Sequence, residues 1–193
     1  HEIALGVKAL HDAGFCHLDL SPENILVKRI IAASGKTEWK IRIIDFSAAR
    51  YIKKNESDLL LSSDNYSKVG YMSPEQAFFL MKKRETYRRD KADIWALSII
   101  FRITLLGSSP LRNGHILSGF QAQLSAWNRC RNIHPHFLML FNCMEQSEDK
   151  RPTINQVIKY LETIANDHKI RLSSKVAEEH SGNEMLAIIE QWM

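Results

Sequence analysis

The longest apolar stretch of the chain runs from Ile94 to Leu106 and limits the folds open to it. An α-helix needs about 20 apolar residues to cross a bilayer, and this stretch is shorter and carries Arg102. A helix that is apolar on all sides is typical of a protein core. The sequence therefore predicts a buried helix over residues 90–106, ended by Gly107 and Pro110, rather than a membrane span.

Shorter elements surround this helix. Apolar residues at helical spacing near the N-terminus predict a short amphipathic helix that Gly14 would end. Two apolar runs, 25–27 and 39–44, flank a polar turn and predict a β-hairpin. Further helices are predicted after Pro74 and over 116–127, 135–145 and 153–167, with Thr153 as an N-cap. The expected fold class is mainly α, a helical bundle with a small β-hairpin ribbon.

Composition and charge exclude several classes of protein. The chain has 193 residues, of which 45% are hydrophobic and 25% charged, as in ordinary one-domain globular proteins. Its net charge of +4 is spread along the chain without a basic run, so we expect no nucleic-acid partner and no membrane partner. The three cysteines (Cys16, Cys130 and Cys143) form no CxxC pair, which favours free thiols in the cytoplasm or nucleus.

Three polar residues lie at the ends of the predicted loop and strand. Asp19 and Asn24 belong to the loop 15–24, and Asp45 directly follows the second strand. Mg²⁺ prefers oxygen ligands and often shares them with phosphates. Two carboxylates and an amide in this setting therefore suit a magnesium site. A Cys16–His17 nucleophilic pair is not expected, because adjacent side chains of an extended segment point apart.

The order of these residues resembles the protein kinase family. The signature H-R-D-L-x-x-x-N, D-F-G and A-P-E corresponds here to His17-Leu18-Asp19-Leu20 with Asn24, to Asp45-Phe46-Ser47 and to Ser73-Pro74-Glu75. Asp93-Ile94-Trp95, the stretch 106–111 and Asp149-Lys150-Arg151-Pro152 resemble further family motifs. The run Ser21-Pro22-Glu23-Asn24 is more similar to serine/threonine kinases than to tyrosine kinases. The resemblance covers residues 1–167.

The resemblance implies a C-terminal kinase lobe over residues 1–167, with a catalytic loop at 15–24 and an activation segment at 45–75. Residues 168–193 are expected to form a polar linker and a short C-terminal helix. A complete enzyme of this family would transfer the ATP γ-phosphoryl group to a hydroxyl of a protein substrate.

The resemblance also implies a role for each matching residue. Asp19 would accept or orient the proton of the substrate hydroxyl, while Asn24 and Asp45 would hold Mg²⁺ on the ATP phosphates. His17 and Phe46 would be packing residues of the regulatory spine of the kinase. Glu75 and Arg151 would form a buried ion pair. Asp93 would anchor the backbone of the catalytic loop.

Some residues depart from the family pattern. Leu18 replaces the arginine that receives a phosphorylated activation segment, so we expect any activity not to be switched on in that way. Ser47 replaces glycine, which predicts a stiffer hinge. Ser21 stands where serine/threonine kinases carry lysine, and Lys68 stands where they carry threonine. We hypothesise that Lys68 supplies the cation missing at Ser21; the alternative is a solvated loop lysine.

The given sequence contains neither the Gly-rich loop nor the strand lysine and helix glutamate of the N-terminal kinase lobe. That lobe is therefore an expected partner, and the chain alone is expected to be nearly inactive. Two functions remain open: a serine/threonine kinase, or a pseudokinase or docking lobe that binds proteins without chemistry.

Overall fold

The computed structural model describes residues 1–31, 35, 37–51, 68, 70–83, 87–106, 142–170 and 172. Its helices are α1 (Glu2–Asp12), α2 (Pro74–Leu80), α3 (Arg89–Leu106) and α6 (Ile154–Asp167), with 3₁₀ turns η1 (Pro22–Asn24) and η2 (Glu148–Lys150). Its strands are β1 (Phe15–Cys16), β2 (Ile25–Ile31), β3 (Thr37–Ile43) and β4 (Arg50–Tyr51). The described part is thus helical with small antiparallel sheets, as predicted.

Several predicted features lie outside the described residues. They are the helix over 116–127, most of the helix over 135–145, the helix stop at Gly107 and Pro110, and nearly all of 168–193. Of the 135–145 helix only residues 142–145 are described, and only Asn142 of these is helical.

The predicted central helix is confirmed as α3. Every residue from Lys91 to Arg102 is buried, and the Trp95 side chain is fully enclosed. The same core includes Val7 of α1 and Val157 of α6, so α3 joins the two ends of the described chain. No helix in the described ranges is long and apolar enough to cross a bilayer.

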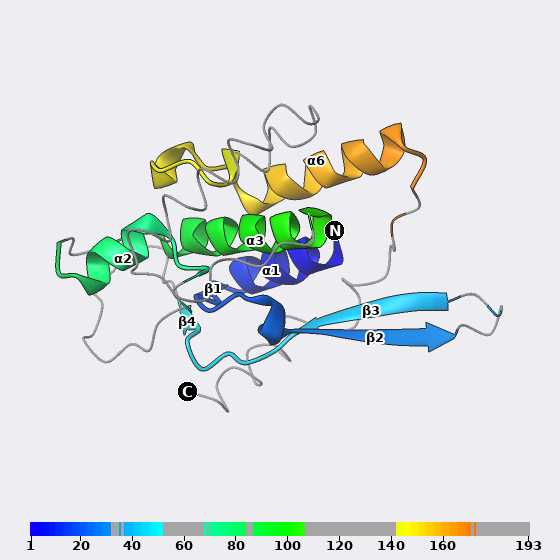
Figure 1. Cartoon of the computed structure of the whole chain (residues 1–193), viewed down its shortest axis with the longest axis horizontal. Coiled ribbons are helices and arrows are strands. Elements are labelled where there is room, and N and C mark those ends of the chain that lie inside the picture. Colours follow the sequence, from blue (N-terminus) through cyan, green and yellow to red (C-terminus); the bar gives the residue numbers. More distant parts are fainter. Residues whose placement is uncertain are drawn as a thin grey trace.

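Helix α1 links the helices to the sheet. It packs against α3, α6 and β3, and Figure 1 shows the β2–β3 hairpin running along one side of the helices. Gly6 permits this approach: a Cβ atom built there would lie 2.9 Å from Cδ1 of Ile43. Because Ile43 ends β3, this contact fixes the strand end from which the candidate site begins.

The hairpin forms as predicted but is longer. Strands β2 and β3 pair antiparallel from Ile25 opposite Ile43 out to Ile31 opposite Thr37. Only its base packs on the core, while Val27, Ile31 and Trp39 are more than half exposed further out.

The predicted loop 15–24 is wrong in part, because it contains a short strand. Strand β1 pairs antiparallel with β4, with Phe15 opposite Tyr51 and Cys16 opposite Arg50. Two-residue strands are too short to show alternating polarity, so their pairing follows from the tertiary fold and not from a local pattern.

Two helices begin with the same reciprocal cap. Ser73 accepts a hydrogen bond from the backbone of Gln76 and receives the Gln76 side chain on its own backbone, and Thr153 and Gln156 repeat this at α6. The predicted N-cap at Thr153 is confirmed. The two caps differ in setting, since Ser73 is fully buried and Thr153 is exposed.

Candidate active site

Asp93 of α3 holds the backbone of the predicted catalytic loop. Its Oδ2 accepts the backbone N–H of His17 and its Oδ1 accepts that of Leu18, both at 2.8 Å. The carboxylate is 1% exposed. Charge-assisted hydrogen bonds of this kind are about twice as strong as neutral ones. The central helix therefore fixes the loop directly before Asp19.

The peptide held by Asp93 has an unfavourable conformation. Leu18 has φ 64°, in the left-handed region, which costs a non-glycine residue roughly 1–2 kcal/mol. Such a conformation persists only where its surroundings determine it. Here the Asp93 bond to the Leu18 N–H holds it, and the side chain is buried in an apolar cluster with Cys16, Ala48 and Tyr87.

Asp19 and Asn24 lie together at the end of the loop. The Asn24 side-chain amide donates to the Asp19 carbonyl at 2.8 Å and to Asp19 Oδ2 at 3.1 Å. This leaves the Asn24 amide oxygen on the opposite end of the group, available to a cation. The backbone of the two segments is also joined, because the Ile44 N–H donates to the Asn24 carbonyl at 2.9 Å.

Asp45 follows this junction and is exposed. Its Oδ1 accepts the Ser47 hydroxyl at 2.6 Å and the Ser47 backbone N–H at 3.3 Å. These two hydrogen bonds lower the pKa of the Asp45 carboxyl below its ordinary value. Within the described residues Oδ2 has no hydrogen-bond partner. Asp45, and not Ser47, has the positive φ, at 63°.

His17 and Phe46 pack beneath this exposed edge. Their ring centroids are 5.3 Å apart, and His17 is fully buried. The Asp19 N–H donates to His17 Nδ1 at 3.3 Å, so Nε2 carries the proton and donates to the Ile44 carbonyl at 3.1 Å. The imidazole thus links the loop of Asp19 to the strand end of Asp45.

Lys68 approaches the loop from the predicted activation segment. Its backbone N–H donates to Asp19 Oδ1 at 3.0 Å, and its Nζ donates to Ser21 Oγ at 3.0 Å. Its Nζ also lies 3.5 Å from Glu23 Oε2. The structure therefore brings Asp19, Ser21, Asn24 and Lys68 into one hydrogen-bonded group.

Glu75 and Arg151 form a buried pair away from this group. The guanidinium binds both carboxylate oxygens, with Nη2 to Oε2 at 2.7 Å and Nη1 to Oε1. Both residues are at most 2% exposed. Arg151 also lies over the Trp95 ring, 4.9 Å from its centroid, and donates to the Lys91 carbonyl at 3.0 Å. The pair ties the start of α2 to α3 and to the segment before α6.

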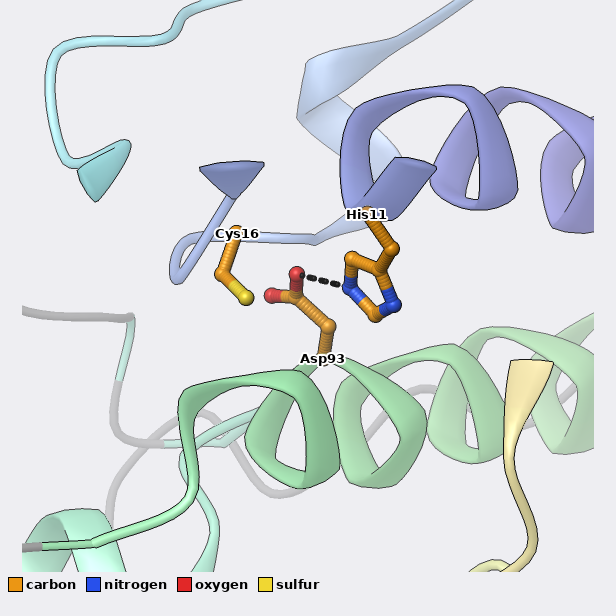
Figure 2. A group of neighbouring side chains, drawn as sticks. All are labelled: His11, Cys16 and Asp93. Atoms are coloured by element: carbon orange, nitrogen blue, oxygen red, sulfur yellow. Dashed lines mark hydrogen bonds and ion pairs between the residues drawn. The ribbon is translucent and has the colours of Figure 1, made fainter. Parts of the chain in front are cut away.

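A second group of possible metal ligands lies behind the loop. Figure 2 shows His11, Cys16 and Asp93 turned toward one another, with ligand atoms all within 4.8 Å. His11 Nε2 is 2.9 Å from Asp93 Oδ2. Because the Asp93 carboxylate already accepts two backbone N–H groups, we interpret this cluster as a brace for the loop.

Sequence reasoning missed three supporting side chains. His11 contacts Asp93, Gln76 donates to the Leu18 carbonyl at 3.5 Å, and buried Lys91 donates to the Arg151 carbonyl at 2.7 Å. Burial lowers the pKa of Lys91. The partners are 58 to 82 positions apart in the sequence. No local pattern could therefore predict these contacts.

Comparisons with known proteins identify the family of the chain. Residues 1–161 match the protein kinase domain model. The serine/threonine-protein kinase PSK1 of Saccharomyces cerevisiae is 25% identical over 158 residues, 81% of this chain and 10% of that protein. The ovarian-specific serine/threonine-protein kinase Lok of Drosophila melanogaster is 23% identical over 171 residues, 82% of this chain and 32% of that protein.

Ribosomal protein S6 kinase 2 alpha of Gallus gallus is 34% identical over 114 residues, 59% of this chain and 13% of that protein. The chain spans no more than 32% of the length of these three relatives. The family match covers far more than half of the chain and confirms the resemblance inferred from the motifs. The chain belongs to the protein kinase domain family.

Proposed function

We propose that residues 1–167 form the C-terminal lobe of a serine/threonine protein kinase, which transfers the γ-phosphoryl group of ATP to a hydroxyl of a protein substrate. The observation that carries this proposal is the placement of Asp19, Asn24 and Asp45 at one junction. Asn24 donates to Asp19, and its carbonyl accepts the N–H of Ile44, the residue before Asp45. Oxygen ligands for a cation thus lie beside a carboxylate that can take a proton.

The residues divide the work of the transfer. Asp19 orients the substrate hydroxyl and accepts its proton while the hydroxyl oxygen bonds to the γ-phosphorus and the bond to the ADP oxygen breaks. Asn24 and Asp45 would hold Mg²⁺, which supplies neutralisation of the phosphate charge when bound. Asp45 is suited to this because it is exposed and its Oδ2 has no partner within the described residues. Asp93 keeps Asp19 in place through the Leu18 backbone.

The lobe assignment requires a second part. Protein kinases need a lysine–glutamate pair to position the ATP phosphates. In this proposal the pair comes from an N-terminal lobe outside residues 1–167. The buried free thiol of Cys143 supports a reducing compartment, the cytoplasm or the nucleus.

A second candidate function is a pseudokinase or docking lobe. Leu18 favours it, because it is 8% exposed in an apolar cluster where the family signature has a charged arginine. The ionised Asp45 and the ordered Asp19–Asn24 pair weigh against it, since a docking surface has no need of either. We therefore place catalysis first.

The test is phosphotransfer by the full-length protein to a mixture of protein substrates, with Mg·ATP. We expect Asp19→Asn and Asp45→Asn each to lower the rate by at least about 10²-fold. The exposed Asp12→Asn on α1 serves as the control and should leave it unchanged. Absence of transfer in the wild type would support the docking function instead, and equal rates in all variants would contradict the roles given to Asp19 and Asp45.

A further inference from the structure

Lys68 is the one residue between Tyr51 and Gly70 of the predicted activation segment that the structure describes. It contacts the catalytic loop twice, with its backbone on Asp19 and its ammonium on Ser21. A solvated loop lysine would keep its side chain free, because ordering it costs up to about 2 kcal/mol of rotamer entropy. This double contact therefore calls for another explanation.

We propose that the protein has exchanged two catalytic positions: the Lys68 ammonium, carried by the activation segment, contacts the transferring phosphoryl group, and Ser21 on the catalytic loop holds that ammonium in place. The inference rests on the proposed function and deepens it. It assigns Lys68 as a catalytic residue and Ser21 as its positioning residue.

The geometry places the ammonium where the reaction occurs. Ser21 is two residues from Asp19 and is fully buried, so its hydroxyl is a fixed acceptor. The ammonium lies 3.0 Å from that hydroxyl, while the same lysine's backbone N–H lies 3.0 Å from the Asp19 carboxylate. The residue that carries the ammonium is thus bonded through its backbone to the group that would take the proton, and its ammonium is held two residues further along the same loop.

The ammonium also keeps capacity for a ligand. Lysine has three donors, and within the described residues Lys68 Nζ has Ser21 at 3.0 Å and Glu23 at 3.5 Å as partners. The side chain remains 45% exposed. The third donor can therefore reach a phosphate oxygen without breaking the contact with Ser21.

The exchange explains how the segment is placed without a phosphate. Leu18 is buried in an apolar cluster and cannot receive a phosphorylated residue. The two Lys68 hydrogen bonds attach the segment to the loop directly. Charge and position thus come from a single residue: changing the Lys68 side chain should remove the charge and the Ser21 contact, while the backbone bond to Asp19 remains.

The experiment uses the full-length protein with two readouts: the ratio of the dissociation constants of Mg·ADP and Mg·ATP, and the kcat of phosphotransfer. Lys68→Met removes the charge at similar length, Lys68→Arg keeps it, and exposed Lys159→Met on α6 is the matched control. We expect Lys68→Met to lower kcat by on the order of 10²-fold and to abolish the preference for ATP over ADP. Lys68→Arg should retain most of that preference.

A double variant sharpens the test. Ser21→Lys with Lys68→Thr restores the family's usual arrangement and should recover kcat above that of Lys68→Thr alone. If the buried position is too small for the new lysine, the double variant loses the native circular dichroism spectrum. The proposal is then tested by comparing kcat and the ATP preference of Lys68→Met with those of Lys68→Arg. Unfolding transitions of all variants confirm that the comparison is between folded proteins.

The outcomes separate the two proposals. Full kcat and full ATP preference in Lys68→Met would overturn the exchange and leave the kinase proposal standing. A wild type that binds ATP with a Lys68-dependent preference but transfers nothing would overturn the kinase proposal and the catalytic role of Lys68, and would leave only the contact of Lys68 with the γ-phosphate of bound ATP. A wild type with no preference for ATP over ADP would overturn the exchange.

Discussion

Two groups of carboxylates in the molecule serve opposite purposes. One is the exposed catalytic edge, Asp19 and Asp45, and the other is a buried network that contains Asp93 and Glu75. At the edge, Asp45 is exposed and its Oδ2 has no partner among the described residues, while Asp19 shares its oxygens with Asn24 and Lys68. In the network, Asp93 and Glu75 are at most 2% exposed, and their carboxylates meet backbone N–H groups or a guanidinium.

The two groups differ in the source of the positive charge or hydrogen-bond donor that each carboxylate meets. A buried carboxylate needs a partner from the protein itself, since burying an unpaired charge costs several kcal/mol. A carboxylate at the surface stays ionised in water and can accept a ligand. The buried network therefore contributes stability and the exposed edge contributes chemistry. The residue types alone do not show this difference, because both groups contain acidic residues.

The largest expected effect is on the buried ion pair. Glu75→Gln leaves the Arg151 guanidinium buried without its counter-charge, which we expect to lower the free energy of unfolding by about 3–5 kcal/mol. Urea unfolding followed by circular dichroism measures it. Glu162→Gln, at a half-exposed glutamate on α6, is the matched control and should change the value by less than about 1 kcal/mol. Equal effects of the two changes would remove the distinction between network and surface.

The next effect separates two aspartates of one helix. Asp93→Asn turns an acceptor of two backbone N–H groups into a group with one acceptor oxygen, and we expect a loss of about 2–3 kcal/mol in stability. Asp90→Asn, three positions earlier and paired with partly exposed Arg88, should cost less than about 1 kcal/mol. Thermal and urea unfolding give both values. A larger loss of unfolding free energy in Asp90→Asn than in Asp93→Asn would contradict the distinction between buried and exposed carboxylates.

The two helix caps give a smaller contrast. Thr153→Ala removes an exposed cap and should cost about 1 kcal/mol, whereas Ser73→Ala leaves a buried backbone N–H without its acceptor and should cost up to about 2 kcal/mol. Gln76, the partner of Ser73, also contacts the Leu18 carbonyl. Only Ser73→Ala should therefore lower phosphotransfer as well, and a loss of rate in Thr153→Ala would contradict this.

The smallest effect is a pKa change at the exposed edge. Ser47 lowers the Asp45 pKa by donating two hydrogen bonds, so the carboxyl stays ionised as the pH falls below its ordinary pKa. Ser47→Gly removes the hydroxyl, and the Asp45 pKa should rise toward the ordinary value. Carbon-detected NMR titration of the Asp45 carboxyl measures it. An unchanged or lower pKa would show that the hydroxyl does not stabilise the carboxylate.

Local patterns of apolar residues predicted the helices and the hairpin. The continuous apolar run predicted α3, and two apolar runs on either side of a polar turn predicted β2 and β3, though their outer ends were missed because the hairpin projects beyond the core. Strands β1 and β4 were not predicted. Each has two residues, and they exist only because the fold brings Phe15 beside Tyr51.

The candidate site was predicted from motif order and not from geometry. Asp19, Asn24 and Asp45 match family motifs, and the structure places them at one junction, but their roles stay predictions. Lys68 was singled out only as a departure from the family pattern. The contacts of His11 with Asp93 and of Lys91 with Arg151 join positions far apart in sequence, which only tertiary structure can reveal.

The central claim is that the exposed edge binds Mg²⁺ with ATP while the buried network only supports it. The most direct measurement is calorimetric titration of the full-length protein with ATP, with and without Mg²⁺, for wild type and Asp45→Asn. We predict that Mg²⁺ tightens ATP binding in the wild type, and that Asp45→Asn loses this gain while its unfolding free energy changes by less than about 0.5 kcal/mol. Mg²⁺-dependent binding of equal strength in Asp45→Asn would contradict the account.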